Sequence, residues 1–456
     1  MVRRWRAVAP PGVACLRRFV ANALARQGTG WVEQVIVLLM SLAPGTPAPD
    51  VFSPGKIGNV TLRNRIVKAA TFEGRCPKGR ITDELIEFHA EYARGGVGMT
   101  TVAYLATSPE GRTDKHQYHW GMDDGGMLRK LTDAVHAEGA AISAQVGHAG
   151  AVANGSSNGL PPLGPSRIPA PTGLAITKPC TEADIDRIVS DHVRAARGAH
   201  EAGFDAIEVH FGHNYLVSEF LSPKLNRRKD SYGGSLENRA RFARRIGRAI
   251  RDAMGDKIAV TIKLNMDDGV PGGFWIDEAR QVAQWLEQDG SADALVMTVG
   301  SSLLNPIYLF KGAAPLEEFA ATQPAVIKMG MKVVGPKMFK EYPYTDAYMF
   351  DDARQIREAV DLPMMLLGGI VDRPSIDKAM GAGFEFVAMG RGLLREPDLP
   401  NKLKEDDRRR SLCVHCNRCM ATIYSGSRCV LREYVPPIPA RGGHDTLQAT
   451  SPTPPV

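Results

Sequence analysis

The chain has 456 residues, of which 44% are apolar and 23% charged. This composition is ordinary for a globular protein with a large core, and it excludes disorder of the whole chain. The formal net charge of +6 is concentrated in residues 1–47, which hold six arginines and one glutamate. The remaining chain is nearly neutral, so we expect no nucleic-acid partner.

Residues 1–49 are predicted to form an N-terminal extension outside the folded domain. Their longest apolar run, residues 35–40, is too short to cross a bilayer, and their order of residues differs from that of a secretory signal. Two interpretations remain: a disordered extension, or an upstream start codon with Met40 as the true first residue, which we favour. No run of 18 apolar residues exists anywhere, so we expect no membrane partner. Seven cysteines, four of them within seventeen residues, favour a reducing, cytoplasmic location over a disulfide framework.

Eight short apolar segments rich in Val, Ile and Ala predict buried strands that alternate with helices. Most are apolar on both faces, as strands of a parallel sheet must be. The predicted strands are residues 65–70, 98–103, 140–146, 206–209, 258–264, 294–299, 363–367 and 386–389. Eight strand–helix alternations predict an α/β fold, a (β/α)₈ TIM barrel over residues 50–400.

Periodic segments between the strands are long enough for crossover helices. They are residues 83–94, 182–202, 235–254, 277–288, 351–360 and 373–380. Ser235 is expected to cap its helix, with Glu237 in the positive first turn. Residues 300–349 interrupt the alternation of strands and helices and contain five prolines, which indicates a lid or subdomain. Residues 434–456 are expected to form a disordered tail.

The segment after the fourth strand, EVHFGHNYL, places His210, His213 and Tyr215 at the end where barrel enzymes carry their reactive side chains. Two neutral imidazoles there can donate hydrogen bonds to one oxygen, and a nearby phenol can deliver a proton. One alternative is that the histidines satisfy backbone groups in a loop. Another is a metal pair, which lacks a carboxylate partner at ligand spacing.

Residues 208–242 resemble the signature of the old yellow enzyme family, the NADH:flavin oxidoreductases. In that family HxxH or HxxN, then Tyr, then a DxYGGSxxNRxRF run appear in this order, and residues 230–242 here read DSYGGSLENRARF. The resemblance extends over about residues 51–399. It implies an FMN-binding barrel that uses NAD(P)H, and it makes His210, His213 and Tyr215 the expected catalytic residues.

The resemblance also implies residues that contact the flavin ring. Thr71, preceded by Ala70, falls where the family places a Thr or Cys beside a flavin carbonyl. Gln145, in AQVGHAG, matches the glutamine that pairs with the pyrimidine edge. Lys263 stands where most members carry Arg, and supplies a cation near N1 and O2. Asn214, a glycine in most members, is a second departure.

The flavin phosphate is expected on the loops after the last two strands. Gly368, Gly369 and Gly390 allow a close approach of backbone N–H groups, and Arg391 adds charge at the start of a short helix. Taken alone, these glycines are ordinary turn residues. The chain has neither GxGxxG nor GxxxxGK[ST], so the nicotinamide is expected to dock directly over the flavin.

A cysteine cluster is predicted in a C-terminal extension, residues 401–433. Cys413, Cys416, Cys419 and Cys429 give the spacing C-x2-C-x2-C-x9-C. It is similar to the [4Fe-4S] spacing of the family's dienoyl-CoA reductase branch, which usually has wider spacing and an additional nucleotide domain. Zinc, free thiols or a vestigial site remain as alternatives, and His415 is an alternate ligand.

The resemblance implies an ene-reductase. NAD(P)H reduces the flavin, and an α,β-unsaturated carbonyl held by His210 and His213 takes hydride from N5 while Tyr215 protonates the α-carbon. Amine or other dehydrogenase or demethylase chemistry on the same scaffold is one alternative, and an iron–sulfur/flavin electron-transfer module is another. The expected partners are a small-molecule substrate and the nicotinamide. The oligomeric state stays open, a homo-oligomer included.

Overall fold

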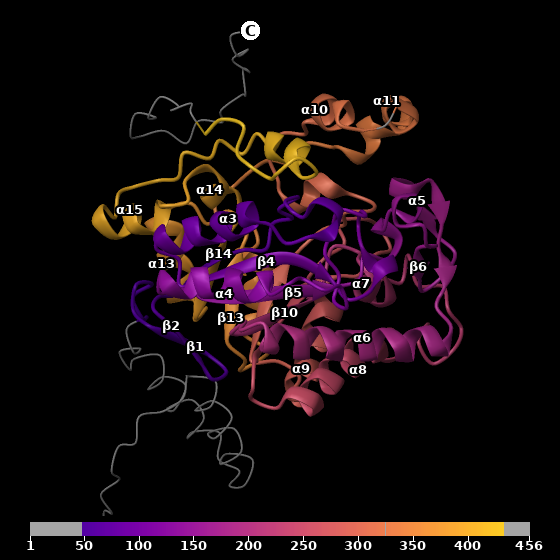
Figure 1. Cartoon of the computed structure of the whole chain (residues 1–456), viewed down its shortest axis with the longest axis horizontal. Helices are drawn as coiled ribbons and strands as arrows, with labels where there is room; N and C mark the ends of the chain where they lie inside the picture. Colours follow the sequence, from indigo (N-terminus) through magenta and orange to yellow (C-terminus); the bar gives the residue numbers. More distant parts are fainter. Residues whose placement is uncertain (1–47, 324, 433–456) are drawn as a thin grey trace, which may run out of the picture.

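The computed structural model describes residues 48–323 and 325–432 (Figure 1). The predictions for residues 1–47 and for the tail 434–456 therefore lie outside the described residues. Within the described part of the chain, no helix is long and apolar enough to cross a membrane.

Eight parallel strands close into a barrel, as the sequence predicts. The strands are β3 (Ile66–Lys68), β4 (Met99–Ala106), β5 (Ala141–Gly147), β10 (Ala206–Phe211), β11 (Ala259–Asn265), β12 (Ala294–Thr298), β13 (Met364–Leu367) and β14 (Phe386–Met389). Each predicted strand segment overlaps one of them, although β4, β5, β10 and β11 extend beyond the predicted ends, and β14 pairs with β3 to complete the ring. Nearly all strand residues are buried, because helices cover the outer face.

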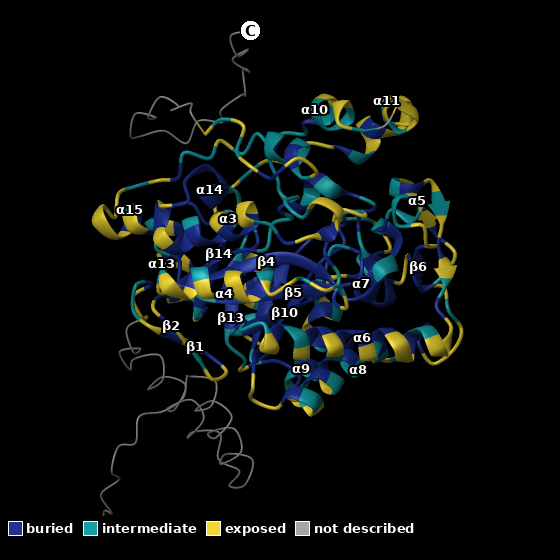
Figure 2. Ribbon diagram, viewed as in Figure 1, coloured by how far each residue is buried: buried dark blue, intermediate teal, exposed yellow. Residues whose placement is uncertain are grey.

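Helices surround the barrel, with buried residues toward the strands and exposed residues on the outer side (Figures 1 and 2). The main helices that follow the eight strands are α3 (Asp83–Arg94), α4 (Met127–Ala137), α6 (Glu182–Glu201), α8 (Leu236–Met254), α9 (Ile276–Gln288), α12 (Phe350–Arg357), α13 (Arg373–Gly381) and α15 (Leu399–Glu405). All six predicted helical segments are confirmed. Ser235 caps α8 by accepting a hydrogen bond from the Asn238 backbone N–H, as predicted.

A hairpin closes the end of the barrel where the strands begin. It consists of β1 (Gly55–Ile57) and β2 (Val60–Leu62). Ile57 and Leu62 are buried in the same cluster as Val67 and Phe386 of the barrel strands. The opposite end, at the carboxyl ends of the strands, is therefore the open one.

Two insertions lie at the open end. Residues 300–349 form α10 (Leu316–Ala321) and α11 (Ala325–Met338), and α10 packs against the 3₁₀ turn η6 (Arg418–Thr422) of the C-terminal extension (Figure 1). Between β5 and α6 the chain forms the short α5 (Gly155–Asn158) and the strands β6 (Leu163–Gly164), β7 (Pro169–Ala170), β8 (Ala175–Ile176) and β9 (Lys178–Pro179).

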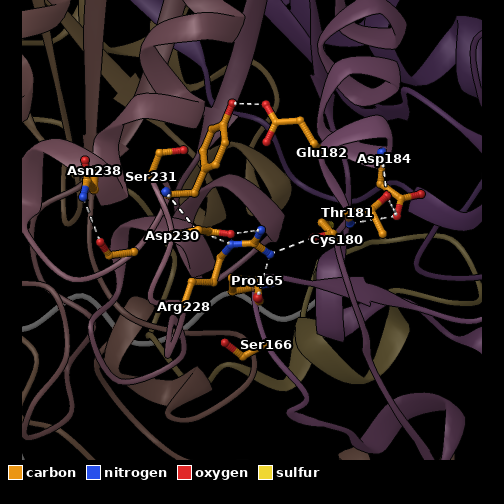
Figure 3. Close-up of polar contacts among 12 residues, drawn as sticks. Pro165, Ser166, Cys180, Thr181, Glu182, Asp184, Arg228, Asp230, Ser231 and Asn238 are labelled. Carbon is orange, nitrogen blue, oxygen red and sulfur yellow. Dashed lines mark hydrogen bonds and ion pairs between the residues drawn. The ribbon is translucent and has the colours of Figure 1, made fainter.

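The beginning of the DSYGGSLENRARF segment, together with Arg228 just before it, is held in place by polar contacts (Figure 3). Arg228 forms an ion pair with Asp230 and donates hydrogen bonds to the backbone carbonyl oxygens of Pro165 and Cys180, at 3.2 and 2.7 Å. The Tyr232 hydroxyl donates to Glu182 at 2.9 Å. These contacts fasten the segment after α7 (Leu216–Leu221) to the insertion that precedes α6.

Candidate active site

A cavity of about 350 Å³ opens where the strands end, and all eight barrel strands or the loops that follow them contribute to its wall. It contains every residue that the sequence assigns to catalysis or to the flavin: His210, His213, Tyr215, Ala70, Thr71, Gln145, Lys263, Gly368, Gly369, Gly390 and Arg391. None of residues 230–242 belongs to its described lining. The structure thus gathers the predicted residues in one place, whereas the second part of the family signature, residues 230–242, lies outside the cavity wall.

The two predicted imidazoles contact each other at the rim of β10. His210 Nε2 lies 3.2 Å from His213 Nδ1, and His213 Nε2 lies 2.7 Å from the Thr298 hydroxyl. His213 has a left-handed backbone, with φ of 61°, which turns the chain so that both rings face the cavity. Burial lowers the pKa of His213 to about 3 and lowers the pKa of His210 well below its usual value, with further lowering by the Lys263 charge. Both rings are therefore neutral at physiological pH.

These lowered pKa values predict a loss of stability in acid. The unfolded chain binds a proton at each histidine near pH 6.5, whereas the folded protein does not. The free energy of unfolding therefore falls with decreasing pH below about 6.5, by up to about 1.4 kcal/mol per pH unit for each group. We expect the melting temperature to fall between pH 7 and 5 and His213→Asn to reduce that fall, measured in thermal melts at constant ionic strength. Equal pH dependence in both proteins would contradict this prediction.

Asn214 also adopts a left-handed backbone, with φ of 51°. This conformation explains why glycine is usual at the position, and asparagine is one of the few other residues that tolerates it. The Asn214 side-chain amide donates to Asp268 at 3.0 Å, which fixes the turn.

Tyr215 follows the imidazoles and lies beside them. Its ring centroid is 4.7 Å from that of His210 and 5.3 Å from that of Tyr104, whose own hydroxyl donates to the Gly111 carbonyl at 3.0 Å. Burial raises the pKa of Tyr215 above its usual value. Tyr215 is therefore protonated at neutral pH and can act as an acid toward a strong base.

Glu208 links the two residues predicted for the flavin's pyrimidine edge. Its Oε1 accepts hydrogen bonds from Gln145 Nε2 at 2.6 Å and from Lys263 Nζ at 2.7 Å, and all three side chains are buried. Glu208 was not among the residues predicted from the sequence. Strand periodicity supplies a signal, because residues 208 and 210 of one strand point to the same face.

The loops after β13 and β14 form the far end of the cavity. Gly368 and Gly369 have φ of 96° and 78°, and a Cβ on Gly369 would lie 2.7 Å from the Ala347 nitrogen. At Gly390 a Cβ would meet only Thr71, at 3.8 Å, so an open space adjoins that backbone. Arg391 donates to the backbone carbonyls of residues 310 and 311 and to Asn417. It thus ties this end of the cavity to both the insertion and the C-terminal extension.

This donor set fits FMN. An amide (Gln145), a cation (Lys263) and a hydroxyl (Thr71) face one cavity whose wall is otherwise mainly apolar, and glycine loops with an arginine lie at its other end. A flavin needs this combination: hydrogen bonds at one edge of a flat ring and positive charge for a phosphate.

The four predicted cysteines line a second, small cavity beside Arg391 and Arg395. Burial raises the pKa of Cys413, Cys429 and Cys419, the last to about 12. In residues 48–323 and 325–432, no three His, Cys, Asp or Glu side chains stand close enough to hold a single metal ion. The extension also reaches the larger cavity, which Cys419 and Tyr424 line.

Comparison with known proteins places these observations in a family. A model described as the NADH:flavin oxidoreductase / NADH oxidase family matches residues 50–301. A Rhodococcus erythropolis protein named 4,4'-dithiodibutanoate disulfide reductase is 53% identical over 85% of this chain and 96% of its own length.

Solved structures agree with the fold. A complex of 2-naphthoyl-CoA reductase with 2-naphthoyl-CoA superposes with a TM-score of 0.66 at 27% identity, covering 78% of this chain and 52% of that one, so this chain spans about half of that enzyme. Morphinone reductase in complex with tetrahydroNAD covers 88% of this chain and all of its own, with a TM-score of 0.63 at 23% identity. From the barrel, the gathered site residues and these similarities, the chain belongs to the NADH:flavin oxidoreductase / NADH oxidase family.

Proposed function

We propose that this oxidoreductase binds FMN and uses NAD(P)H to reduce small electrophiles, in particular the activated C=C bond of α,β-unsaturated carbonyls. The observation that carries the proposal is the single cavity in which His210, His213 and Tyr215 face the ring-binding set Gln145, Lys263 and Thr71. When bound, FMN supplies hydride transfer from the nicotinamide to the acceptor. Nicotinamide and acceptor use the same place in turn.

The imidazole pair holds the acceptor oxygen. The Gly212 backbone N–H lies 3.3 Å from His210 Nδ1, which leaves the His210 proton on Nε2. The Thr298 hydroxyl can donate to His213 Nε2, which leaves that proton on Nδ1. These two nitrogens lie only 3.2 Å apart, so both protons cannot lie on the line between them. A carbonyl oxygen that enters from the cavity lets both N–H groups turn toward it and donate hydrogen bonds to it. These bonds strengthen as negative charge develops on the oxygen.

Tyr215 supplies the proton. Its hydroxyl is a weak acid, so it transfers a proton only to a base as strong as an enolate carbon. Tyr215 is therefore needed only for acceptors whose reduction produces such a carbon.

A second candidate substrate is an organic disulfide, because the relative that is 53% identical bears the name of a disulfide reductase. Hydride would attack one sulfur and displace the other as a thiolate, and no carbon would need a proton. The two candidates therefore differ in their need for Tyr215.

An absorbance spectrum of the purified protein and titration of the apoprotein with FMN test the proposal. We expect a yellow protein that binds FMN and is reduced by NADH or NADPH. Turnover with enones, organic disulfides and amines then ranks the acceptors. A folded protein that is colourless and does not bind added FMN would exclude the proposed function.

We also propose that Cys413, Cys416, Cys419 and Cys429 hold a [4Fe-4S] cluster. Their four thiols surround one small cavity, and four cysteine thiolates are the ligand set of such a cluster. A cluster separates its thiolates by its own iron and sulfide atoms. Anaerobically purified protein should contain about four iron and four sulfide per chain. Cys416→Ser should lose iron, and equal iron content in the variant would contradict the assignment.

A further inference from the structure

Lys68, in the short strand β3, is a buried cation next to the cavity. Its side chain is 1% exposed, and its Nζ lies 3.0 Å from Thr71 Oγ1, 3.5 Å from the Thr101 carbonyl oxygen and 3.7 Å from Glu73 Oε1. The rings of Phe88 and Tyr92 lie 5.2 and 5.4 Å from the same nitrogen. Thr71 is the one of these contacts that lines the cavity.

Burying an ammonium group is costly, and an apolar residue of similar size would fill the same space without that cost. Burial lowers the pKa of Lys68 to about 8, so the group is still a cation at neutral pH. Glu73 offsets part of the cost as its counterion. A buried charge that contacts a cavity residue therefore calls for a role in the site.

The direction of the hydrogen bond is fixed by chemistry. An ammonium group only donates, so the Thr71 oxygen must accept. The Thr71 hydrogen is then free to point elsewhere, and the nearby positive charge makes it a stronger donor. On the side away from Lys68, Thr71 faces the cavity.

We propose that Lys68 is a positioning residue that polarises the Thr71 hydroxyl and thereby raises the reduction potential of a flavin bound in the cavity. The inference rests on the proposed function, because it requires FMN with a ring carbonyl beside Thr71. A stronger hydrogen bond to that carbonyl stabilises the electron-rich reduced ring more than the oxidised ring.

A purely structural role for Lys68 is the competing explanation. Glu73 accepts hydrogen bonds from the Ala103 backbone N–H at 2.9 and 3.1 Å and lies 3.4 Å from His89 Nε2, so the ion pair also connects β3 to β4 and α3. If Lys68 were purely structural, its replacement would change the free energy of unfolding, and any change in the flavin potential would not depend on the Thr71 hydroxyl.

The test is a double-mutant cycle on the flavin potential. Lys68→Met/Glu73→Gln removes the buried pair without leaving a lone charge and keeps an acceptor for Ala103, and Thr71→Val removes the hydroxyl. Each protein is loaded with FMN, its affinity for FMN is measured by fluorescence titration, and its flavin is titrated against dyes of known potential.

We expect the Lys68→Met/Glu73→Gln protein to bind FMN but to show about a tenfold lower ratio of reduced to oxidised flavin at fixed potential, a shift of about 30 mV. In the Thr71→Val background the same pair of substitutions should cause little shift. Equal shifts in both backgrounds, or none in either, would overturn this inference alone. Wild-type protein that binds no FMN would overturn the proposed function and this inference with it.

Discussion

Tyr215→Phe is expected to slow the reduction of an enone by about 10²–10⁴-fold, because it removes the proposed proton donor of the second half-reaction. Reduction of the flavin by NAD(P)H should not change, since that step transfers no proton from Tyr215. Stopped-flow absorbance of the flavin measures the two half-reactions separately. Organic disulfides should be reduced at the wild-type rate, because their reduction forms no carbanion.

Tyr104→Phe is the matched control. Its phenol lines the same cavity, with its ring 5.3 Å from that of Tyr215, but its hydroxyl is already donated to the Gly111 carbonyl. We expect a small effect on enone reduction. If the Tyr215 variant reduces enones at the wild-type rate, the proton-donor role is wrong.

Lys263→Met is expected to lower the free energy of unfolding of the apoprotein by about 3–5 kcal/mol. The substitution leaves Glu208, which is 4% exposed, as a buried carboxylate without its cation. Urea denaturation of apoprotein measures the change. Adding Glu208→Gln should recover most of the loss, because a neutral amide still accepts the Gln145 hydrogen bond.

Lys263→Arg separates the charge from the shape of the side chain. It keeps the cation at the position and should retain most of the stability, at the cost of repacking around a larger group. If Lys263→Met is as stable as wild type, the buried Glu208 carboxylate does not need Lys263 as its counterion, and the stabilising role assigned to this ion pair is wrong.

The barrel was predictable because its signal is local and repeated. Eight apolar segments of strand length alternate with amphipathic segments, and each segment carries its own evidence for strand or helix. The gathering of Thr71, Gln145, His210 and Lys263 also follows, since residues at the carboxyl ends of barrel strands converge on one mouth.

The charged partners behind the site were not predictable in the same way. Glu208 and Lys68 make contacts of 2.6–3.0 Å with side chains on other strands or loops, and these contacts depend on the barrel's register. The extension posed a similar difficulty. Its cysteine spacing suggested a separate metal site, whereas Cys419 and Tyr424 also line the large cavity. The Tyr424 ring contacts that of Phe72, 352 residues earlier, and a contact between residues so far apart leaves no local pattern.

The loop braced by Arg228 and Tyr232 has a consequence for how such proteins diverge. This stretch secures the scaffold and stays outside the described cavity wall, so a substitution in the wall leaves these bracing contacts intact. Two proteins that share this stretch can therefore have different substrates, and acceptor preference should instead follow residues such as Tyr104 and Tyr424.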